Sequence, residues 1–314
     1  MITFLLYVIA AAMIAALLFF AVSYYLGSHV YGAEDFTAIP FINNSDNIQW
    51  LQEQSSAESF SFLVLGDIQA GYRNLSRLLK TTSEPYAFAV QTGDLVSHAD
   101  QGHYSLALYE LKKSDLQMPL FVVPGNHDVK GNPGLFDIYF KLKQFYFVWS
   151  GCLFIFLDNS LGAPYDILFH FLEETLKEHQ GKVRWTCIFI HRPPIDWEHG
   201  EPRPELKNYS RFFEIQKAYK INYVFSGHLH DYRELELDGT HYIANGLESD
   251  QKDRTGNATY YTVIKVSAEK VLTEKISMHA SSLEAVTGIA LDCAVAHAYP
   301  ILRMIFKIYY GMLL

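Results

Sequence analysis

The sequence predicts an α/β fold, a two-sheet β-sandwich flanked by helices, with apolar helices added at both ends of the chain. Up to Gly227, short apolar segments that favour strands alternate with segments whose apolar residues recur at helical spacing. Beyond Gly227, strand-like segments follow one another through short turns such as Asp238-Gly239. An alternating first half and a strand-rich second half suit two packed sheets with helices on their outer faces.

The N-terminal segment is almost wholly apolar. Residues 2–26 carry no charged side chain, and as a helix rising about 1.5 Å per residue they can cross the roughly 30 Å hydrocarbon core of a bilayer. We therefore expect residues 1–27 to form a single transmembrane anchor. A signal peptide cleaved after Gly32 is the alternative, but the apolar run is longer than a usual signal-peptide core and no Lys or Arg precedes it.

The segment after the anchor is polar. Residues 28–59 include a cluster of Asn, Ser and Asp, which predicts a linker with one helical turn near residues 48–54. Few charges flank the anchor, because only Glu34 and Asp35 follow it closely and no Lys or Arg precedes Arg73. The positive-inside rule then favours a cytoplasmic N-terminus, with the folded domain outside the cytoplasm.

The folded domain is expected at residues 60–279. Its elements are predicted from the spacing of apolar residues and from the turn residues between them. The predicted strands are residues 62–65, 87–90, 120–123, 145–149, 153–157, 187–190, 223–225, 233–237, 240–244, 260–266 and 270–277. The predicted helices are residues 74–80, 104–113, 135–144 and 166–179.

Residues 280–314 are expected to be helical. Ser281 and Glu284 resemble a capping box that opens one helix, and Pro300 would start a second. The second helix is nearly all apolar except for a narrow stripe with Arg303 and Lys307. Such a helix suits the membrane interface, where its cations meet anionic head groups. Packing on the domain, or against a second copy of the chain in a homodimer, is the alternative.

Length and composition agree with this organisation. In a chain of 314 residues, a domain of this size can bury a large core without disulfides. The formal net charge of -9 argues against a general nucleic-acid binder, which would need a basic face. The three cysteines show no paired spacing, so free, buried thiols are expected.

Polar clusters follow five of the strand-like segments. They read Gly-Asp-Ile-Gln at 66–69, Gly-Asp at 93–94, Gly-Asn-His-Asp at 125–128, His at 191 and Gly-His-Leu-His at 227–230. Because α/β folds place their sites where strands end at one edge of a sheet, we expect these side chains to converge. Carboxylate, carboxamide and imidazole groups suit two divalent cations of the Mn, Fe or Zn type. The sequence therefore predicts a binuclear metal hydrolase.

The residue types also suit two adjacent metals. A carboxylate such as that of Asp94 can bridge two cations about 3.5–4 Å apart. His228 and His230 point the same way along an extended segment and can each serve one cation, while Gln69 and Asn126 add neutral oxygens. Taken singly, each cluster could be a helix cap or a turn, but five clusters in order favour the metal site.

The ordered clusters resemble those of the calcineurin-like metallophosphoesterases, Asp-x-His, Gly-Asp, Gly-Asn-His-(Asp/Glu), His and Gly-His-x-His. The match runs from about residue 60 to residue 271, and it differs at Gln69, where the family usually has His. The resemblance implies that Asp94 bridges both metals. It also implies a first site of Asp67, Gln69, Asp94 and His230 and a second site of Asp94, Asn126, His191 and His228.

Further residues are candidates for the chemistry of a phosphoryl transfer. His127, beside a ligand but facing elsewhere, is the natural general acid for the leaving group. Asp128 would either orient His127 or hold the loop. Arg192 directly follows a ligand and would bind the phosphate bidentately, unless it is a surface arginine. His98 and His103 would face the cleft or lie in solvated loops.

These expectations together predict a membrane-anchored, metal-dependent phosphoesterase. Two metals would activate a shared water for attack on phosphorus. The apolar segments at both ends favour a lipid-linked phosphate or pyrophosphate as the substrate. One alternative is a phosphatase for soluble phosphomonoesters. Another is a catalytically weak member that serves as a binding scaffold, with Gln69 as the first sign of lost activity.

Overall fold

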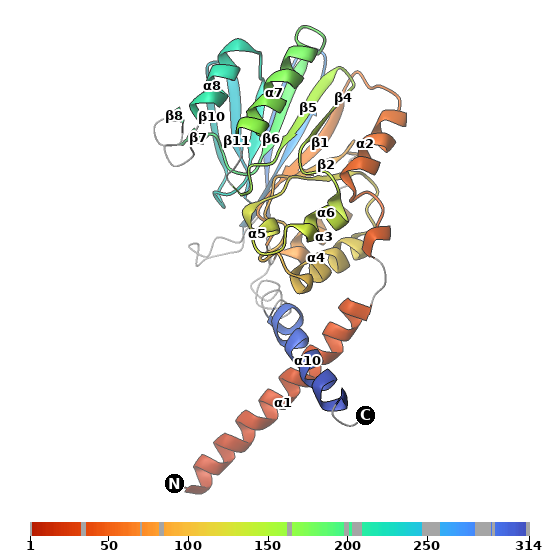
Figure 1. The fold of residues 1–314 in the computed structure, drawn as a ribbon, viewed down its shortest axis with the longest axis vertical. Coiled ribbons are helices and arrows are strands. Elements are labelled where there is room, and N and C mark those ends of the chain that lie inside the picture. Colours follow the sequence, from red (N-terminus) through yellow and green to blue (C-terminus); the bar gives the residue numbers. More distant parts are fainter. Residues whose placement is uncertain are drawn as a thin grey trace.

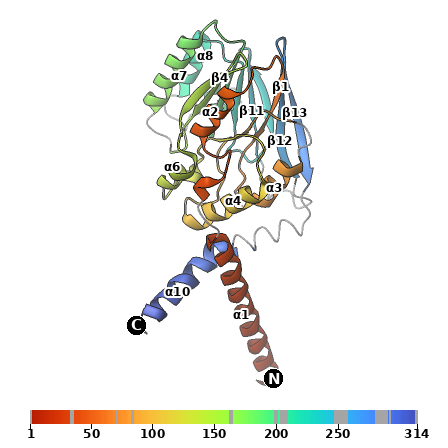
Figure 2. The same ribbon diagram turned by 90° about the vertical axis from the view of Figure 1, so that its right-hand side faces the viewer.

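The computed structural model describes residues 2–32, 36–69, 71–81, 85–161, 165–197, 201–202, 209–246, 258–279, 290 and 293–311. Its upper part is a sandwich of two sheets with helices on both outer faces (Figure 1). Two helices, one from each end of the chain, project below the sandwich and diverge from one another (Figures 1 and 2). This αββα arrangement confirms the predicted fold class.

The first sheet has the strand order β13-β12-β1-β2-β3. Its strands are β1 (Phe60–Leu65), β2 (Ala89–Gln91), β3 (Leu120–Val122), β12 (Ala258–Val266) and β13 (Val271–His279). The strands β1, β2 and β3 run parallel to one another, whereas β12 and β13 pair antiparallel. The parallel part comes from the alternating half of the sequence, and β12 and β13 come from the strand-rich end.

The second sheet has the order β10-β11-β9-β6-β5-β4. Its strands are β4 (Phe145–Trp149), β5 (Cys152–Leu157), β6 (Trp185–Ile190), β9 (Tyr223–Ser226), β10 (Arg233–Leu237) and β11 (Thr240–Ala244). The four inner strands are parallel, and the two edge strands pair antiparallel with their neighbours. A short hairpin, β7 (Ile195–Asp196) and β8 (Glu201–Pro202), follows β6.

Alternation along the strands divides the core into three layers. On β1, the side chains of Phe62 and Val64 face the second sheet, whereas those of Leu63 and Leu65 face the helices. The space between the sheets is rich in phenylalanine, with ring contacts such as Phe62 to Phe88 at 4.8 Å between centroids. Large buried rings of this kind contribute several kcal/mol each, so the sandwich gives the strand ends a rigid support.

Helices cover both outer faces of the sandwich. The helices α3 (Tyr72–Thr81) and α4 (Gln101–Ser114) share the first sheet's outer core, and α7 (Tyr165–His179) and α8 (Tyr209–Ala218) share that of the second sheet. Each predicted strand is present with shifts of a few residues. The helix predicted at residues 135–144 is shorter than expected, because α6 (Gly134–Phe140) ends at Phe140. The helix α8 was not predicted.

The expected polar linker is in part a structured edge of the domain, which corrects that expectation. The helix α2 (Asn44–Glu53) packs beside β3, the outermost strand of the first sheet. The Asn44 amide donates to the carbonyl oxygens of Val122 and Leu142 at 2.9 and 2.8 Å, and its Oδ1 accepts from the Val122 amide at 2.9 Å. The polar side chains that suggested a linker instead satisfy the open edge of a strand.

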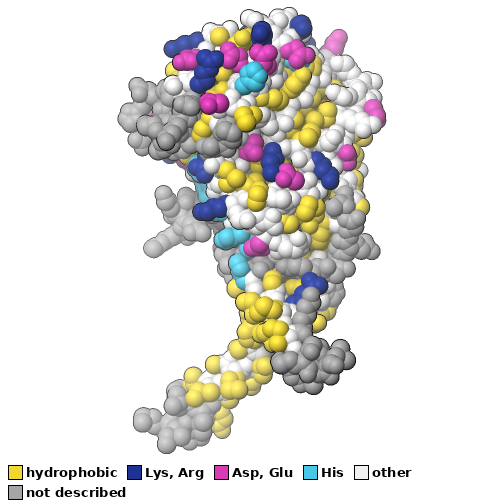
Figure 3. Space-filling view, viewed as in Figure 1, with side chains coloured by type: hydrophobic (Ala, Val, Ile, Leu, Met, Phe, Trp, Pro, Cys, Tyr) yellow, Lys and Arg dark blue, Asp and Glu magenta, His cyan; other side chains and the backbone are white. Residues whose placement is uncertain are grey.

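The N-terminal helix α1 (Ile2–Gly32) is long and apolar enough to cross a membrane. Within it, Tyr7–Ser28 has a mean hydropathy of 2.2, and only 6% of this stretch is buried. Apolar side chains cover the surface of this lower helix (Figure 3). A signal sequence near the N-terminus passes the same test of length and apolar composition.

The C-terminal segment packs against α1 and against the domain. It consists of a π-helical turn η2 (Cys293–Ala298) and helix α10 (Tyr299–Gly311), which starts where Pro300 predicted a helix. Tyr299 lies with its ring centroid 5.7 Å from that of Tyr24, and a Cβ on Gly27 would come within 2.1 Å of the Tyr299 ring. The predicted capping box at Ser281 lies outside the described residues.

Candidate metal centre

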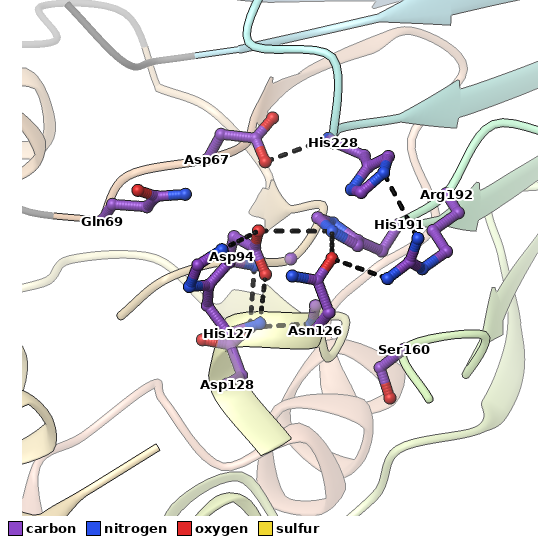
Figure 4. A network of polar contacts seen from close by, with 12 residues as sticks. Asp67, Gln69, Asp94, Asn126, His127, Asp128, Ser160, His191, Arg192 and His228 are labelled. Carbon is purple, nitrogen blue, oxygen red and sulfur yellow. Dashed lines mark hydrogen bonds and ion pairs between the residues drawn. The ribbon is translucent and has the colours of Figure 1, made fainter. Parts of the chain in front are cut away.

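The predicted ligands lie at one end of the sandwich, where strands of both sheets end. The first sheet supplies Asp67 and Gln69 after β1, Asp94 after β2, and Asn126 at the start of the short helix α5 (Asn126–Val129) after β3. The second sheet supplies His191 after β6 and His228 and His230 after β9. Figure 4 shows labelled side chains from both sheets pointing into one common space. The convergence expected from the sequence is therefore present.

Several of these residues have a left-handed backbone, which residues other than glycine rarely adopt. The φ angle is +52° at Asp67, +57° at Asp94 and +71° at His228. Such conformations cost roughly 1–3 kcal/mol each and gather at functional sites. Gly93 also has a positive φ of +102°, and a Cβ there would lie 2.4 Å from Nδ1 of His191. The glycine before Asp94 therefore leaves room for a ligand of the second sheet.

Two groups of ligand atoms share one carboxylate. The ligand atoms of Asp67, Asp94 and His230 lie within 4.8 Å of one another, and so do those of Asp94, His191 and His228. Because Asp94 belongs to both groups, one carboxylate stands between two sites. This is the arrangement that a pair of bridged divalent ions needs.

The two carboxamides lie beside these groups. Asn126 Oδ1 is 3.2 Å from His191 Nε2, and Gln69 Nε2 is 3.3 Å from His230 Nε2. His191 Nδ1 donates to the carbonyl oxygen of Thr92 at 3.0 Å, so its Nε2 faces the centre. A backbone acceptor on the far nitrogen is the usual way to orient a metal-binding imidazole.

The buried carboxylates are electrostatically strained in the absence of cations. Burial, together with the nearby charge of Asp94, raises the pKa of Asp67 well above its usual range. Burial and the same charge raise the pKa of Asp128 to about 8. Burial acts to raise the pKa of Asp94 as well, but the hydrogen bond and charge of His191 outweigh it and lower that pKa. A divalent ion beside Asp67 would favour its charged form.

The donor set fits two divalent ions. Oδ2 of Asp67 is buried and has no hydrogen-bond partner among the described residues, a costly state for a carboxylate unless a cation completes it. Burial lowers the pKa of His230, which favours the neutral ring that a metal requires. Oxygen and nitrogen donors without thiolates suit Mn, Fe or Zn ions.

His127 faces the opening of this centre. Its ring Nδ1 donates to the carbonyl oxygen of Ser97 at 2.6 Å, and its Nε2 lies 4.0 Å from Oδ2 of Asp94. Its backbone amide donates to Oδ1 of Asp94 at 2.8 Å. The side chain is 41% exposed. One ring nitrogen is thus oriented by the backbone, while the other points between the carboxylate and the solvent.

Asp128 lies behind the site and holds its loops. Its carboxylate accepts the backbone amides of Asp94 and Gly125, each at 2.8 Å, and that of Val96 at 3.0 Å. These bonds join the loop after β2 to the helix α5. Of the two roles considered for Asp128, holding the loop is the one that agrees with its contacts.

Arg192 lies inside the site. Its Nη2 donates to Asn126 Oδ1 at 3.1 Å, and its Nη1 is 3.3 Å from His228 Nε2. The sequence did not point to Asn159, whose side chain fixes the Arg192 backbone through hydrogen bonds of 2.8 and 3.0 Å. Ser160 lies on the same side of the site (Figure 4). The available signal was the polar run at 158–160 directly after the apolar strand β5.

Comparison with known proteins agrees with this geometry. The family model of calcineurin-like phosphoesterases matches residues 60–232, which is more than half of the chain. The chain belongs to this family. The fold and the shared ligand groups are those of a metal-dependent phosphoesterase.

Individual relatives of this chain are distant. Purple acid phosphatase 19 of Arabidopsis thaliana is 22% identical over 236 residues, which are 71% of this chain and 56% of that relative. GAP50, the anchor in the inner membrane complex of Plasmodium, has a TM-score of 0.54 at 16% identity, covering 77% of this chain and 96% of that one. A dimetal phosphatase from Danio rerio has a TM-score of 0.52 at 13% identity, covering 71% and 99%. At these identities the two structures show a common fold.

Proposed function

We propose that this chain is a membrane-anchored phosphoesterase that uses two divalent metal ions to hydrolyse a phosphate ester or pyrophosphate of a lipid-linked substrate. The observation that carries the proposal is the pair of ligand groups that share Asp94. In this proposal, the first metal is held by Asp67, Gln69, Asp94 and His230. The second metal is held by Asp94, Asn126, His191 and His228.

The residues around the metals would divide the remaining work. When bound, the two ions would supply hydroxide from a shared water and polarise a phosphoryl oxygen. Arg192, placed between Asn126 and His228, would bind further phosphoryl oxygens. His127 would give the proton of its Nε2 to the oxygen of the leaving group. Asp128 would hold the loop that carries Asp94, and so keep Asp94 in position for binding the metals.

The position of the apolar helices supports a substrate at a membrane. Both α1 and α10 leave the domain at its lower end (Figures 1 and 2). On α10, Ile301, Met304, Ile305 and Ile308 are exposed. A spanning α1 with α10 at the interface would keep the metal centre near lipid head groups, and the flanking charges favour the domain outside the cytoplasm.

Metal content and hydrolysis test this proposal directly. The full-length chain, purified in detergent and loaded with Mn²⁺, is expected to bind about two ions and to hydrolyse p-nitrophenyl phosphate or bis-p-nitrophenyl phosphate. A lipid-linked phosphoester should be hydrolysed with a lower KM than its water-soluble analogue. Bound metal without hydrolysis of any of these esters would favour the scaffold. Equal KM values for lipid and soluble esters would favour a phosphatase for soluble monoesters.

A further inference from the structure

Three histidines that the metal centre does not use gather beside it. His98 lies in the loop after β2, His103 in α4, and His297 in η2 of the C-terminal segment. The ring centroids of His98 and His103 are 4.9 Å apart, those of His103 and His297 are 5.0 Å apart, and those of His98 and His297 are 6.2 Å apart. We call these three residues the histidine ledge.

The packing of η2 brings His297 to this place. The turn η2 packs on both α1 and α4, and its Val295 is buried in the same core as residues of α4. Histidine side chains are visible on the surface between the domain and the apolar helix below it (Figure 3). The ledge therefore joins the catalytic domain to the helices that are proposed to meet the membrane.

The ledge continues the active site on the side of the general acid. The ring of His98 lies edge to face with that of His127, with 6.3 Å between centroids. Nε2 of His127 in turn faces Asp94 at 4.0 Å. A row of imidazoles thus runs from the bridging carboxylate through His127 and His98 to His297. Because His127 protonates the leaving group, this row lies where the leaving group departs.

The ledge is not arranged as a third metal site. Among the described residues, the groups with ligand atoms within 4.8 Å of one another are the two at the metal centre. Asp100 accepts from Nδ1 of His103 at 2.8 Å, which fixes the buried ring of the ledge.

Exposure and charge suit the binding of an anion by the other two rings. His98 and His297 are both exposed, whereas His103 is buried beneath them. Partial desolvation by its neighbours, followed by the charge of His103, lowers the pKa of His98. Each imidazole carries an N–H donor in its neutral form, and an anion would counteract the mutual repulsion of the protonated rings.

We infer that His98 and His297 form a second phosphate subsite, which binds a phosphate on the leaving group, so that the substrate is a diphosphate. This inference rests on the proposed function and restricts its substrate class from phosphate esters or pyrophosphates to diphosphates. Water supplies an oxygen to the phosphorus at the metal centre, and the bond from that phosphorus to the bridging oxygen breaks. The bridging oxygen leaves with the second phosphate and takes a proton from His127. The water releases two protons, of which one restores His127.

A matched pair of substrates tests the subsite. The full-length, metal-loaded chain in detergent would be assayed with a short prenyl diphosphate, with the prenyl monophosphate, and with inorganic pyrophosphate as the soluble diphosphate. The variants are His98→Ala and His297→Ala, with His241→Ala, an exposed histidine of β11, as the control. Binding of methylenediphosphonate, measured by calorimetry, gives a readout that is independent of turnover.

Each alanine variant is expected to raise the KM for prenyl diphosphate and the Kd of methylenediphosphonate by about tenfold, the effect of one lost hydrogen bond to a charged group. The prenyl monophosphate and the His241→Ala control should be unaffected. His297→Gln, which keeps an N–H donor, should restore most of the binding and so separate recognition from folding. A similar rise in the KM for pyrophosphate would show that the subsite recognises the diphosphate without the lipid. A rise confined to the prenyl substrate would show that the lipid is needed to position the diphosphate in the subsite.

Other outcomes would overturn the subsite. Equal losses on the monophosphate and the diphosphate, or no loss on either, would show that the histidines do not bind a second phosphate. Loss of a bound metal ion in His297→Ala would assign the ledge to a cation instead. A wild-type chain that binds two metals but hydrolyses none of these substrates, while its methylenediphosphonate affinity still depends on His297, would refute the proposed function and leave the subsite standing.

Discussion

At the scale of single residues, the metal centre depends on backbone conformations that its side chains disfavour. Asp67, Asp94 and His228 all have positive φ, and the carboxylate of Asp67 is buried with a raised pKa. Strain and buried charge together make the metal-free site unfavourable, so bound cations should stabilise the fold. The glycines that precede these residues explain why the sequence showed the site so clearly, since each marks a place where the chain turns sharply after a strand.

Removal of the shared carboxylate should empty both sites. We expect Asp94→Ala to retain none of the approximately two divalent ions per chain, because both ligand groups include Asp94. Gln69→Ala should weaken only the first site, and Gln69→His should tighten it, since imidazole is a better donor than an amide. Metal analysis after gel filtration measures these contents. Two ions retained by Asp94→Ala would show that this carboxylate does not bridge.

Replacement of the proposed acid should separate binding from chemistry. His127→Ala should keep both metals and the fold but lose roughly 10²–10⁴ in kcat for esters with poor leaving groups, the usual range for a general acid. Activated esters such as p-nitrophenyl phosphate need no proton on the leaving group and should lose much less. Steady-state rates across a series of leaving groups measure the difference. A uniform loss would refute the role of His127 as the acid.

At the scale of elements, α2 shows how a polar segment can complete a sheet. Its Asn44 and Asn47 side chains bind backbone groups of Leu120 and Val122 along the open edge of β3, the edge that does not pair with β2. Composition could not reveal this contact, because an Asn-rich stretch is equally typical of a solvated linker and of a segment whose side chains bind an open strand edge. Strands were more predictable, since the buried apolar runs of β1 and β5 have few other interpretations.

The edge contact should contribute measurably to stability. Asn44→Ala removes three hydrogen bonds to the backbone, of which two are buried and one is partly buried, and we expect it to lower the free energy of unfolding by about 2–5 kcal/mol. Gln49→Ala, an exposed change on the same helix whose amide contacts Glu53, should change it by less than about 0.5 kcal/mol. Urea unfolding of both variants in the same detergent gives the comparison. Similar values for the two would mean that α2 is only loosely attached.

At the scale of the whole molecule, distant parts of the chain meet at one end of the domain. His297 and His98 are about two hundred residues apart, yet their rings are neighbours. No local pattern predicts such a contact, because it depends on how η2 packs between α1 and α4. The convergence of the candidate ligands, by contrast, was predictable because each of them lies in a loop that follows a strand. The homodimer suggested for the C-terminal helices stays a prediction that the single chain does not test.

The cysteines offer a test of orientation in the membrane. All three are free, and Cys152 and Cys187 are buried with raised pKa values, that of Cys152 to about 11, whereas Cys293 is exposed, contrary to the expected burial. We expect a membrane-impermeant maleimide to label one thiol per native chain and three after denaturation. If the domain lies outside the cytoplasm, intact cells should label as fully as broken ones, and Cys293→Ser should abolish the signal. Labelling only in broken cells would place the domain inside.

The common exit of α1 and α10 beside the histidine ledge has a kinetic consequence. An enzyme held at a bilayer meets a lipid substrate by diffusion in two dimensions, so its rate follows the mole fraction of that lipid in the surface. Adding inert lipid or detergent at a fixed total amount of substrate should then slow turnover, although no inhibitor is present. Diluting the suspension with buffer should leave the rate per enzyme unchanged. Surface dilution of this kind would show that the concentration of substrate within the bilayer, and not its concentration in the suspension, sets the rate.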